Sequence, residues 1–169
     1  MKKVYFAGKF DLSPDPSLSL AERLKEDYRT LLAGDISYAR EPFMLYDSFL
    51  YLGPFYSEQA SDGDFTSTDC NTVLGAEAAS VDACDVLVVV FGEAFSVGSI
   101  VELGWAVEKK KEIIILYKEE SGSPYDIRSE YWFAIADAKR RGAYVSVAAY
   151  QDSKAVPAML LSLLNGNER

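Results

Sequence analysis

The sequence predicts an α/β protein: a three-layer sandwich in which helices cover both faces of a mostly parallel, five-stranded sheet. Short apolar runs alternate along the chain with longer runs of helical periodicity, which is typical of a parallel sheet. Two of the short runs, 86–91 and 113–117, are apolar almost throughout, as expected of strands that are covered on both sides. No repeat and no linker interrupts the pattern, so we expect one domain over residues 1–169.

Each element follows from its own local signal. Ser17 is the expected N-cap of the first helix and Gly34 ends it, whereas residues 45–72 are irregular and rich in aromatic side chains. A loop of that length covers a ligand, joins an oligomer interface or adds a peripheral core. In chain order, the expected elements are a strand at 4–7, a helix at 17–33, a short strand within 36–43, a helix at 73–82, a strand at 86–91, a helix at 100–110, a strand at 113–117, a helix at 131–141, a strand at 143–147 and a helix at 155–164.

The charge and hydropathy of the chain exclude several classes of partner. A net charge of −9 argues against binding to a nucleic-acid polymer, which needs a basic face, but leaves room for a small anionic ligand. No apolar run approaches the roughly 20 residues of a membrane span. The apolar part of residues 1–8 is too short for a signal peptide, so we expect a cytoplasmic protein.

The residue types that are scarce restrict the chemistry. The chain has no histidine, which removes Ser-His-Asp and Cys-His nucleophiles and histidine-ligated metals from consideration. Its two cysteines, Cys70 and Cys84, form neither a disulfide framework nor a metal pair, and we expect them to be reduced thiols. Acid–base or nucleophilic chemistry must therefore use carboxylates, tyrosines, lysines or hydroxyls.

The most informative segment is the junction between the strand at 86–91 and the helix that follows it. Ser96, Gly98 and Ser99 are small residues at this junction, and Glu102 lies in the expected first helical turn. Open α/β sheets bind ligands at this edge, and a helix N-terminus offers free N–H groups and a partial positive charge to an anion. A carboxylate at such a pocket can act as a nucleophile.

A purely structural interpretation of the same residues is also open. Ser99-x-x-Glu102 before an apolar run is the pattern of a capping box, in which Glu102 would fold back onto its own backbone. The two interpretations exclude each other, because a catalytic carboxylate must point into the pocket.

Right-handed crossovers bring the carboxyl ends of the parallel strands to one edge, so Tyr5, Lys9, Ser96 and Glu102 can converge there. Ser96, the amides of Gly98 and Ser99, and Lys9 could together cradle an anion. Simpler alternatives remain open for three of these residues: a core tyrosine at Tyr5, a solvated Lys9 and an ordinary loop hydroxyl at Ser96.

Three segments carry a resemblance to a known family. Tyr5-Phe6-Ala7-Gly8, Asp85 at a strand start, and Ser96-x-Gly98-x-x-x-Glu102-Leu103-Gly104-x-Ala106 resemble the nucleoside 2-deoxyribosyltransferase family and the related 2′-deoxynucleoside 5′-monophosphate N-glycosidases. The order of elements agrees over nearly the whole chain. The resemblance implies a flavodoxin-like fold, homo-oligomers, no cofactor or metal, and a small-molecule nucleoside or nucleotide as substrate.

The resemblance also implies roles for individual residues. Glu102 aligns with the glutamate nucleophile and Tyr5 with the tyrosine that orients it. The carboxylate beside the leaving base matches Glu77, with Asp69 as the other candidate. The remaining expected substrate-binding residues are Gly8, Lys9, Ser96, Gly98, Ser99 and, in the loop that completes a neighbour's site, Asp126.

Ser96 bears on the choice of substrate. Transferases that act on free deoxynucleosides usually have aspartate at this position, whereas a serine is similar to the 5′-monophosphate N-glycosidases, in which it helps to hold the phosphate. An aspartate would repel a phosphate and Ser96 would not.

The preferred hypothesis is an enzyme that cleaves the N-glycosidic bond of 2′-deoxynucleosides through Glu102 and passes the deoxyribose to another base. A carboxylate beneath the anomeric carbon stabilises the oxocarbenium-like transition state of that reaction and can trap it covalently. Hydrolysis of 2′-deoxynucleoside 5′-monophosphates is the alternative on the same carboxylate, and a non-catalytic nucleotide-binding module is the alternative of another class. The sequence leaves the preferred base and the oligomer size open.

Overall fold

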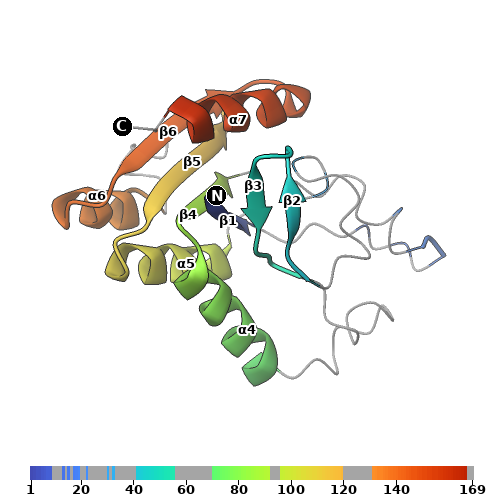
Figure 1. The fold of residues 1–169 in the computed structure, drawn as a ribbon, viewed down its shortest axis with the longest axis horizontal. Coiled ribbons are helices and arrows are strands. Elements are labelled where there is room, and N and C mark those ends of the chain that lie inside the picture. The colour runs from blue at the N-terminus through green and yellow to red at the C-terminus, as the bar shows by residue number, and fades with distance from the viewer. Residues whose placement is uncertain are drawn as a thin grey trace.

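A computed structural model describes residues 1–8, 13, 15, 17–19, 22, 30, 32, 41–55, 70–91, 96–119 and 131–166. Its centre is a six-stranded sheet of order β2-β3-β1-β4-β5-β6 (Figure 1). The strands are β1 (Lys3–Gly8), β2 (Phe43–Leu45), β3 (Phe49–Tyr51), β4 (Val86–Phe91), β5 (Glu112–Lys118) and β6 (Val145–Tyr150). Every neighbouring pair is parallel except β2–β3. The predicted α/β class with a mostly parallel sheet is confirmed.

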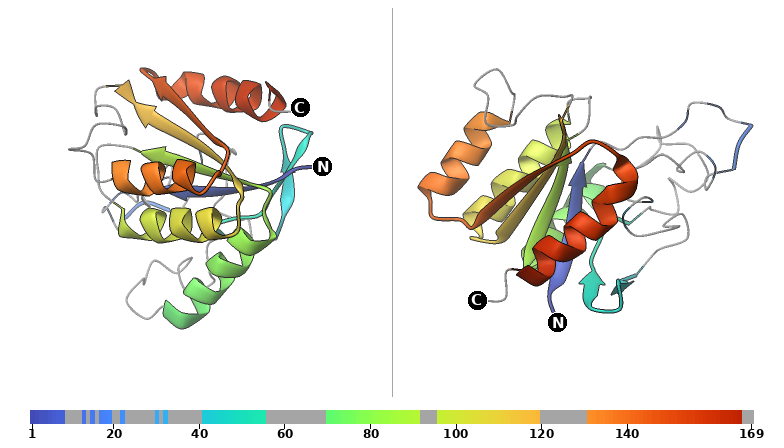
Figure 2. Two further views of the ribbon diagram at one scale, coloured as in Figure 1. Left: turned by 90° about the vertical axis from the view of Figure 1, so that its left-hand side faces the viewer. Right: turned by 90° about the horizontal axis from the view of Figure 1, so that it is seen from above.

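Helices cover both faces of this sheet, as the alternating sequence pattern predicts. Figure 2 shows α5 and α6 on one face and α7 on the opposite face. The helices whose bounds are described are α4 (Cys70–Ala83), α5 (Val97–Glu108), α6 (Trp132–Arg140) and α7 (Val156–Gly166), and a 3₁₀ turn, η2 (Ser153–Ala155), precedes α7. The arrangement is the predicted three-layer, flavodoxin-like sandwich. Among the described helices, none has the length and apolar character needed to cross a membrane.

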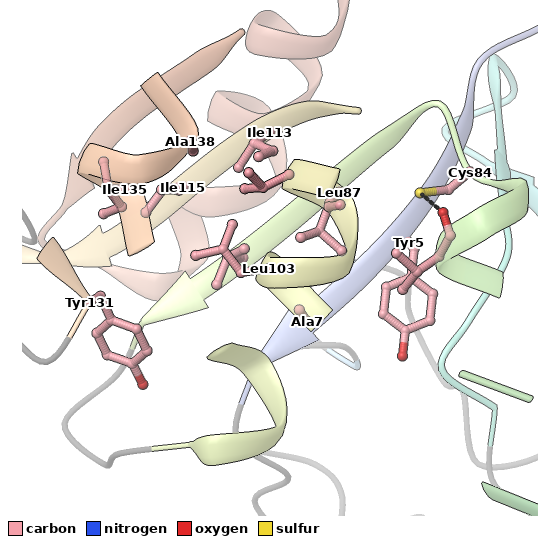
Figure 3. Packing of buried hydrophobic residues seen from close by; sticks show 14 of the residues in the cluster. Tyr5, Ala7, Cys84, Leu87, Leu103, Ile113, Ile115, Tyr131, Ile135 and Ala138 are labelled. Carbon is pink, nitrogen blue, oxygen red and sulfur yellow. Dashed lines mark hydrogen bonds between the residues drawn. The ribbon is translucent and has the colours of Figure 1, made fainter. Parts of the chain in front are cut away.

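Two apolar clusters fill the space between the layers, because successive strand residues point to opposite faces. The α5-side cluster contains, among others, Tyr5, Leu87, Leu103, Ile113 and Ile135, and is drawn in Figure 3. The α7-side cluster contains, among others, Phe6, Val88, Ile114, Leu160 and Leu164. Side chains alternate along β1, so Tyr5 faces α5 while its neighbours Val4 and Phe6 face α7.

The sheet has six strands rather than the expected five. The hairpin β2–β3 lies mostly in the segment expected to be an irregular loop, and the strand expected within 36–43 overlaps β2 only at Phe43. Strands of three residues are too short to show a period. The turn between them uses left-handed Tyr46 and Asp47 (φ 53° and 54°) instead of glycine, so the usual turn signal is missing.

The first helix is capped two residues later than expected. The Ser19 amide and hydroxyl both donate to the Glu22 carboxylate, at 2.9 and 2.6 Å, and the Glu22 amide donates back to Ser19 Oγ. Ser19 and Glu22 thus form the capping box, and the prediction of Ser17 as N-cap is wrong. The described residues of the expected helix that follow Ser19, at 22, 30 and 32, are helical.

Candidate active site

A hydrogen bond between the central strand and α5 forms the centre of the candidate site. The Tyr5 hydroxyl, on β1, donates to Glu102 Oε1, on α5, at 2.5 Å. Tyr5 is fully buried and Glu102 is 7% exposed. A carboxylate taken this far out of water needs hydrogen-bond donors, and the Tyr5 phenol supplies one that is fixed by the strand. The bond fixes the orientation of the Glu102 carboxylate.

The capping interpretation of Glu102 is wrong. The N-cap of α5 is Ser96, whose backbone is extended (φ −131°, ψ 107°), and the helix begins at Val97, earlier than expected. Ser96 Oγ accepts from the Ser99 amide at 3.3 Å and from the Ser99 hydroxyl at 2.8 Å. Ser99 is thus the third residue of the helix and the donor to the cap, and Glu102 lies in the second turn, directed at Tyr5.

The cap determines how the Ser96 hydroxyl can bind a ligand. The amide and the hydroxyl of Ser99 both donate to the lone pairs of Ser96 Oγ, so Ser96 can bind a ligand by donating its own O–H. Ser96 is half-buried and Gly98 is exposed, whereas Ser99 is 1% exposed. The donors of Ser99, which was expected in the substrate site, are already used within the cap.

Tyr131 is a residue of this region that the sequence analysis missed. Its hydroxyl accepts a hydrogen bond from the Ser96 amide at 3.1 Å, and its ring stacks on Phe91 at 3.5 Å between centroids and 22° between planes. In the sequence, Tyr131 is distinguished only as the first residue of an expected helix. Since Ser96 and Tyr131 are 35 positions apart, no local pattern connects them.

Of the other expected site residues, the structure describes Gly8 and Glu77. Gly8 ends β1 and pairs with Val90, at the same sheet edge as the N-terminus of α5. Glu77 is half-buried on α4, the helix that packs against α5 and β1. Lys9, Asp69 and Asp126 lie outside the described residues. The structure thus brings Tyr5 to Glu102, and Ser96, Gly98 and Ser99 to the start of the same helix, about 9 Å along its axis from Glu102.

The Cys84 thiol and the described carboxylates do not form a second reactive centre or a metal site. The Cys84 thiol is buried and donates to the Val81 carbonyl, and burial raises its pKa to about 11, so it is protonated at neutral pH. Within the part of the chain that is described, no group of three or more carboxylates or thiols could hold a metal ion.

A pocket of about 310 Å³ between α4 and α5 is open to solvent. It is lined by Trp105, Glu108 and Lys109 near the C-terminal end of α5, and therefore lies away from Ser96.

The protein is thus an α/β protein of flavodoxin-like fold with a buried carboxylate, Glu102, on the helix that follows β4. The fold is shared with a CMP N-glycosidase, BcmB of Clostridium botulinum, with a TM-score of 0.55 and 18% identity, over 96% of this chain and 99% of that chain. The predicted resemblance in fold is confirmed by this similarity, which covers nearly the whole of both chains.

Two other solved structures are more distant. A variant of SsGBP gives a TM-score of 0.47 and 11% identity, over 100% of this chain and 57% of that one. A "probable GTP-binding protein engB" gives 0.46 and 8%, over 96% and 97%. These two scores are too low to carry an argument. No model of a known protein family matches the sequence, and no curated protein matches it either.

Proposed function

We propose that this protein cleaves the N-glycosidic bond of a nucleoside 5′-monophosphate, with Glu102 as the nucleophile. The buried hydrogen bond between Tyr5 and Glu102 is the observation that carries the proposal, because it holds a carboxylate in one orientation beside the ligand-binding edge of the sheet. The fold of a CMP N-glycosidase supports the same reaction class.

The reaction divides into two displacements. Glu102 bonds to C1′ of the sugar as the C1′–N bond breaks, and the base leaves with a proton from an acid, for which Glu77 and Asp69 are the candidates. In the second displacement, the oxygen of a water molecule bonds to C1′ as the bond between C1′ and Glu102 breaks. The water gives up a proton to a general base, and Glu102 is released as a carboxylate. Tyr5 keeps the carboxylate oriented through both steps.

The phosphate proposal rests on the start of α5. Ser96 offers an uncharged O–H donor, and the helix N-terminus adds a partial positive charge. A Cβ placed on Gly98 would meet only Ser96 Oγ, at 4.0 Å, so packing among the described residues does not require glycine there. A glycine that packing does not require keeps this helix end accessible to a ligand.

Transfer of the sugar to a second base is a second candidate function. It shares the first displacement, and the pattern from Gly98 to Ala106 resembles that of the transferases. The two functions differ only in whether water or a base attacks the glycosyl-enzyme.

A chromatographic turnover assay tests these proposals. CMP, dCMP and deoxycytidine are each incubated with the protein, with and without adenine as acceptor. We expect free cytosine from a monophosphate without acceptor, and a loss of roughly 10³–10⁴-fold in Glu102→Gln. The matched control is Glu108→Gln, an exposed position on the same helix, which should keep full activity.

A new adenine nucleoside or nucleotide would establish transfer instead. If no substrate gives a product that depends on Glu102, the protein is not this enzyme and a binding module becomes the better hypothesis.

Ser96→Asp tests the phosphate separately. Aspartate is as good an N-cap as serine, so the helix should keep its start. We expect KM for the monophosphate to rise roughly tenfold or more through charge repulsion, and KM for deoxycytidine to change much less. Equal changes for both substrates would rule out a phosphate at Ser96.

A further inference from the structure

Tyr131 contacts both ends of the connection between β4 and α5. Its ring lies against Phe91, the last residue of β4, at 3.5 Å between centroids. Its hydroxyl accepts from the amide of Ser96, the N-cap of α5, at 3.1 Å. Tyr131 is 7% exposed and Phe91 is 4% exposed, so the contact is sheltered from water. A single side chain thus contacts the last residue of the strand and the N-cap of the helix.

The hydrogen bond from the Ser96 amide to Tyr131 matters for the position of Ser96. The first amides of a helix have no acceptor within the helix, so their position depends on groups outside it. Ser96 also carries the hydroxyl that accepts both donors of Ser99. A shift of the Ser96 backbone would therefore move the O–H group that we assign to the substrate.

We infer that Tyr131 is a positioning residue, which holds Ser96 and the start of α5 in place for the 5′-phosphate of the substrate. This inference rests on the proposed function. Tyr131 acts through the Ser96 backbone, and its effect should fall on substrate binding at the phosphate rather than on the step that Glu102 performs.

The test compares Tyr131→Phe with a matched tyrosine. Phenylalanine keeps the ring that stacks on Phe91 and removes the hydroxyl that accepts from the Ser96 amide. The control is Tyr46→Phe, which removes another tyrosine hydroxyl bonded to the backbone, the one that donates to the Leu32 carbonyl at 2.6 Å. Melting temperature, kcat and KM are measured for a monophosphate and for the corresponding free nucleoside, and exchange of the Ser96 amide hydrogen is followed by NMR.

We expect Tyr131→Phe to raise KM for the monophosphate five- to tenfold, with kcat and the KM of the free nucleoside within twofold of the parent. The Ser96 amide should exchange at least tenfold faster, and Tyr46→Phe should do neither. A purely structural role would instead lower the melting temperature without separating the two substrates, and that result would overturn the inference.

The failure of the proposed function would be recognised separately. If the parent protein has no Glu102-dependent turnover, the proposed function fails and KM has no meaning. Hydrogen exchange of the Ser96 amide then tests the positioning role of Tyr131. If this amide exchanges faster in Tyr131→Phe and not in Tyr46→Phe, Tyr131 still holds the start of α5. If its exchange is unchanged in Tyr131→Phe, the positioning role is overturned together with the proposed function.

Discussion

Tyr5 and Glu102 are 97 positions apart in the sequence, yet they form one buried hydrogen bond. A hydrogen bond to a charged group contributes about 1.5–3 kcal/mol. If that energy orients the carboxylate for attack, Tyr5→Phe should lower kcat roughly 10- to 100-fold, because phenylalanine keeps the packing and removes the donor. Steady-state kinetics on protein of equal folded fraction measure the effect.

Tyr46→Phe serves as the control for Tyr5→Phe as well, since it removes a hydroxyl from a tyrosine in the β2–β3 turn, away from α5. An unchanged kcat in Tyr5→Phe would mean that the strand does not orient Glu102.

The family resemblance implied this contact, and the structure contains it, because Tyr5 and Glu102 both belong to the short motifs that carry the resemblance. Tyr131 was not predictable in the same way. Nothing in its neighbours distinguishes a tyrosine whose hydroxyl binds a distant amide from one that only packs in a core. The capping box at Ser99 and Glu102 was a local pattern that the structure does not form, since Ser96 starts the helix earlier.

At the scale of elements, Lys111 terminates α4 from outside the helix. Its ammonium donates to the carbonyls of Asp82, at 2.6 Å, and Cys84, at 2.7 Å. The last carbonyls of a helix lack partners within it, and a cation at this end also interacts favourably with the helix dipole. This pair of bonds joins the turn before β5 to the turn before β4.

We therefore expect Lys111→Met to lower the free energy of unfolding by about 1–2 kcal/mol, because two carbonyls lose a charged donor. Urea denaturation followed by circular dichroism measures it. The control is Lys109→Met, which breaks an exposed ion pair with Asp82 at 3.0 Å and should lower the free energy of unfolding much less, because solvent screens that pair. Equal losses in the two variants would show that the Lys111 bonds add nothing beyond surface charge.

The elements that the sequence located well are those whose hydrophobic pattern is long. The strand expected at 86–91 coincides with β4, and the strand expected at 113–117 lies within β5. The β2–β3 hairpin was missed because its strands are short and its turn lacks glycine. A pattern of two or three residues cannot distinguish a short strand from a loop.

At the scale of the whole molecule, the strand order explains how Tyr5 and Glu102 come together. β1 and β4 are adjacent at the centre of the sheet, in register from Val4–Val86 to Gly8–Val90. The helix that follows β4 therefore packs over β1, and Glu102 reaches Tyr5 across that contact. This arrangement was predictable in outline from right-handed crossovers, but the order of the strands was not.

The two sides of the sheet provide a final test, because the candidate site, with Tyr5 and Glu102, is on the α5 side. Leu103 on α5 and Leu160 on α7 are both fully buried, the first in the α5-side cluster and the second in the α7-side cluster. Replacing either leucine with alanine leaves a cavity and should lower the free energy of unfolding by about 2–5 kcal/mol.

Their effects on turnover should differ. Leu103 is next to Glu102 on the helix that must stay in register with Tyr5, so Leu103→Ala should also lower kcat per folded molecule, by roughly tenfold. Leu160→Ala removes the same side chain from the opposite layer and should keep kcat. Denaturant unfolding gives the two stabilities, and turnover is compared at a temperature at which both variants are folded. If both lose stability and neither loses kcat, the position of α5 on the sheet is not what holds Glu102 for the reaction, and the Tyr5 hydrogen bond alone must do so.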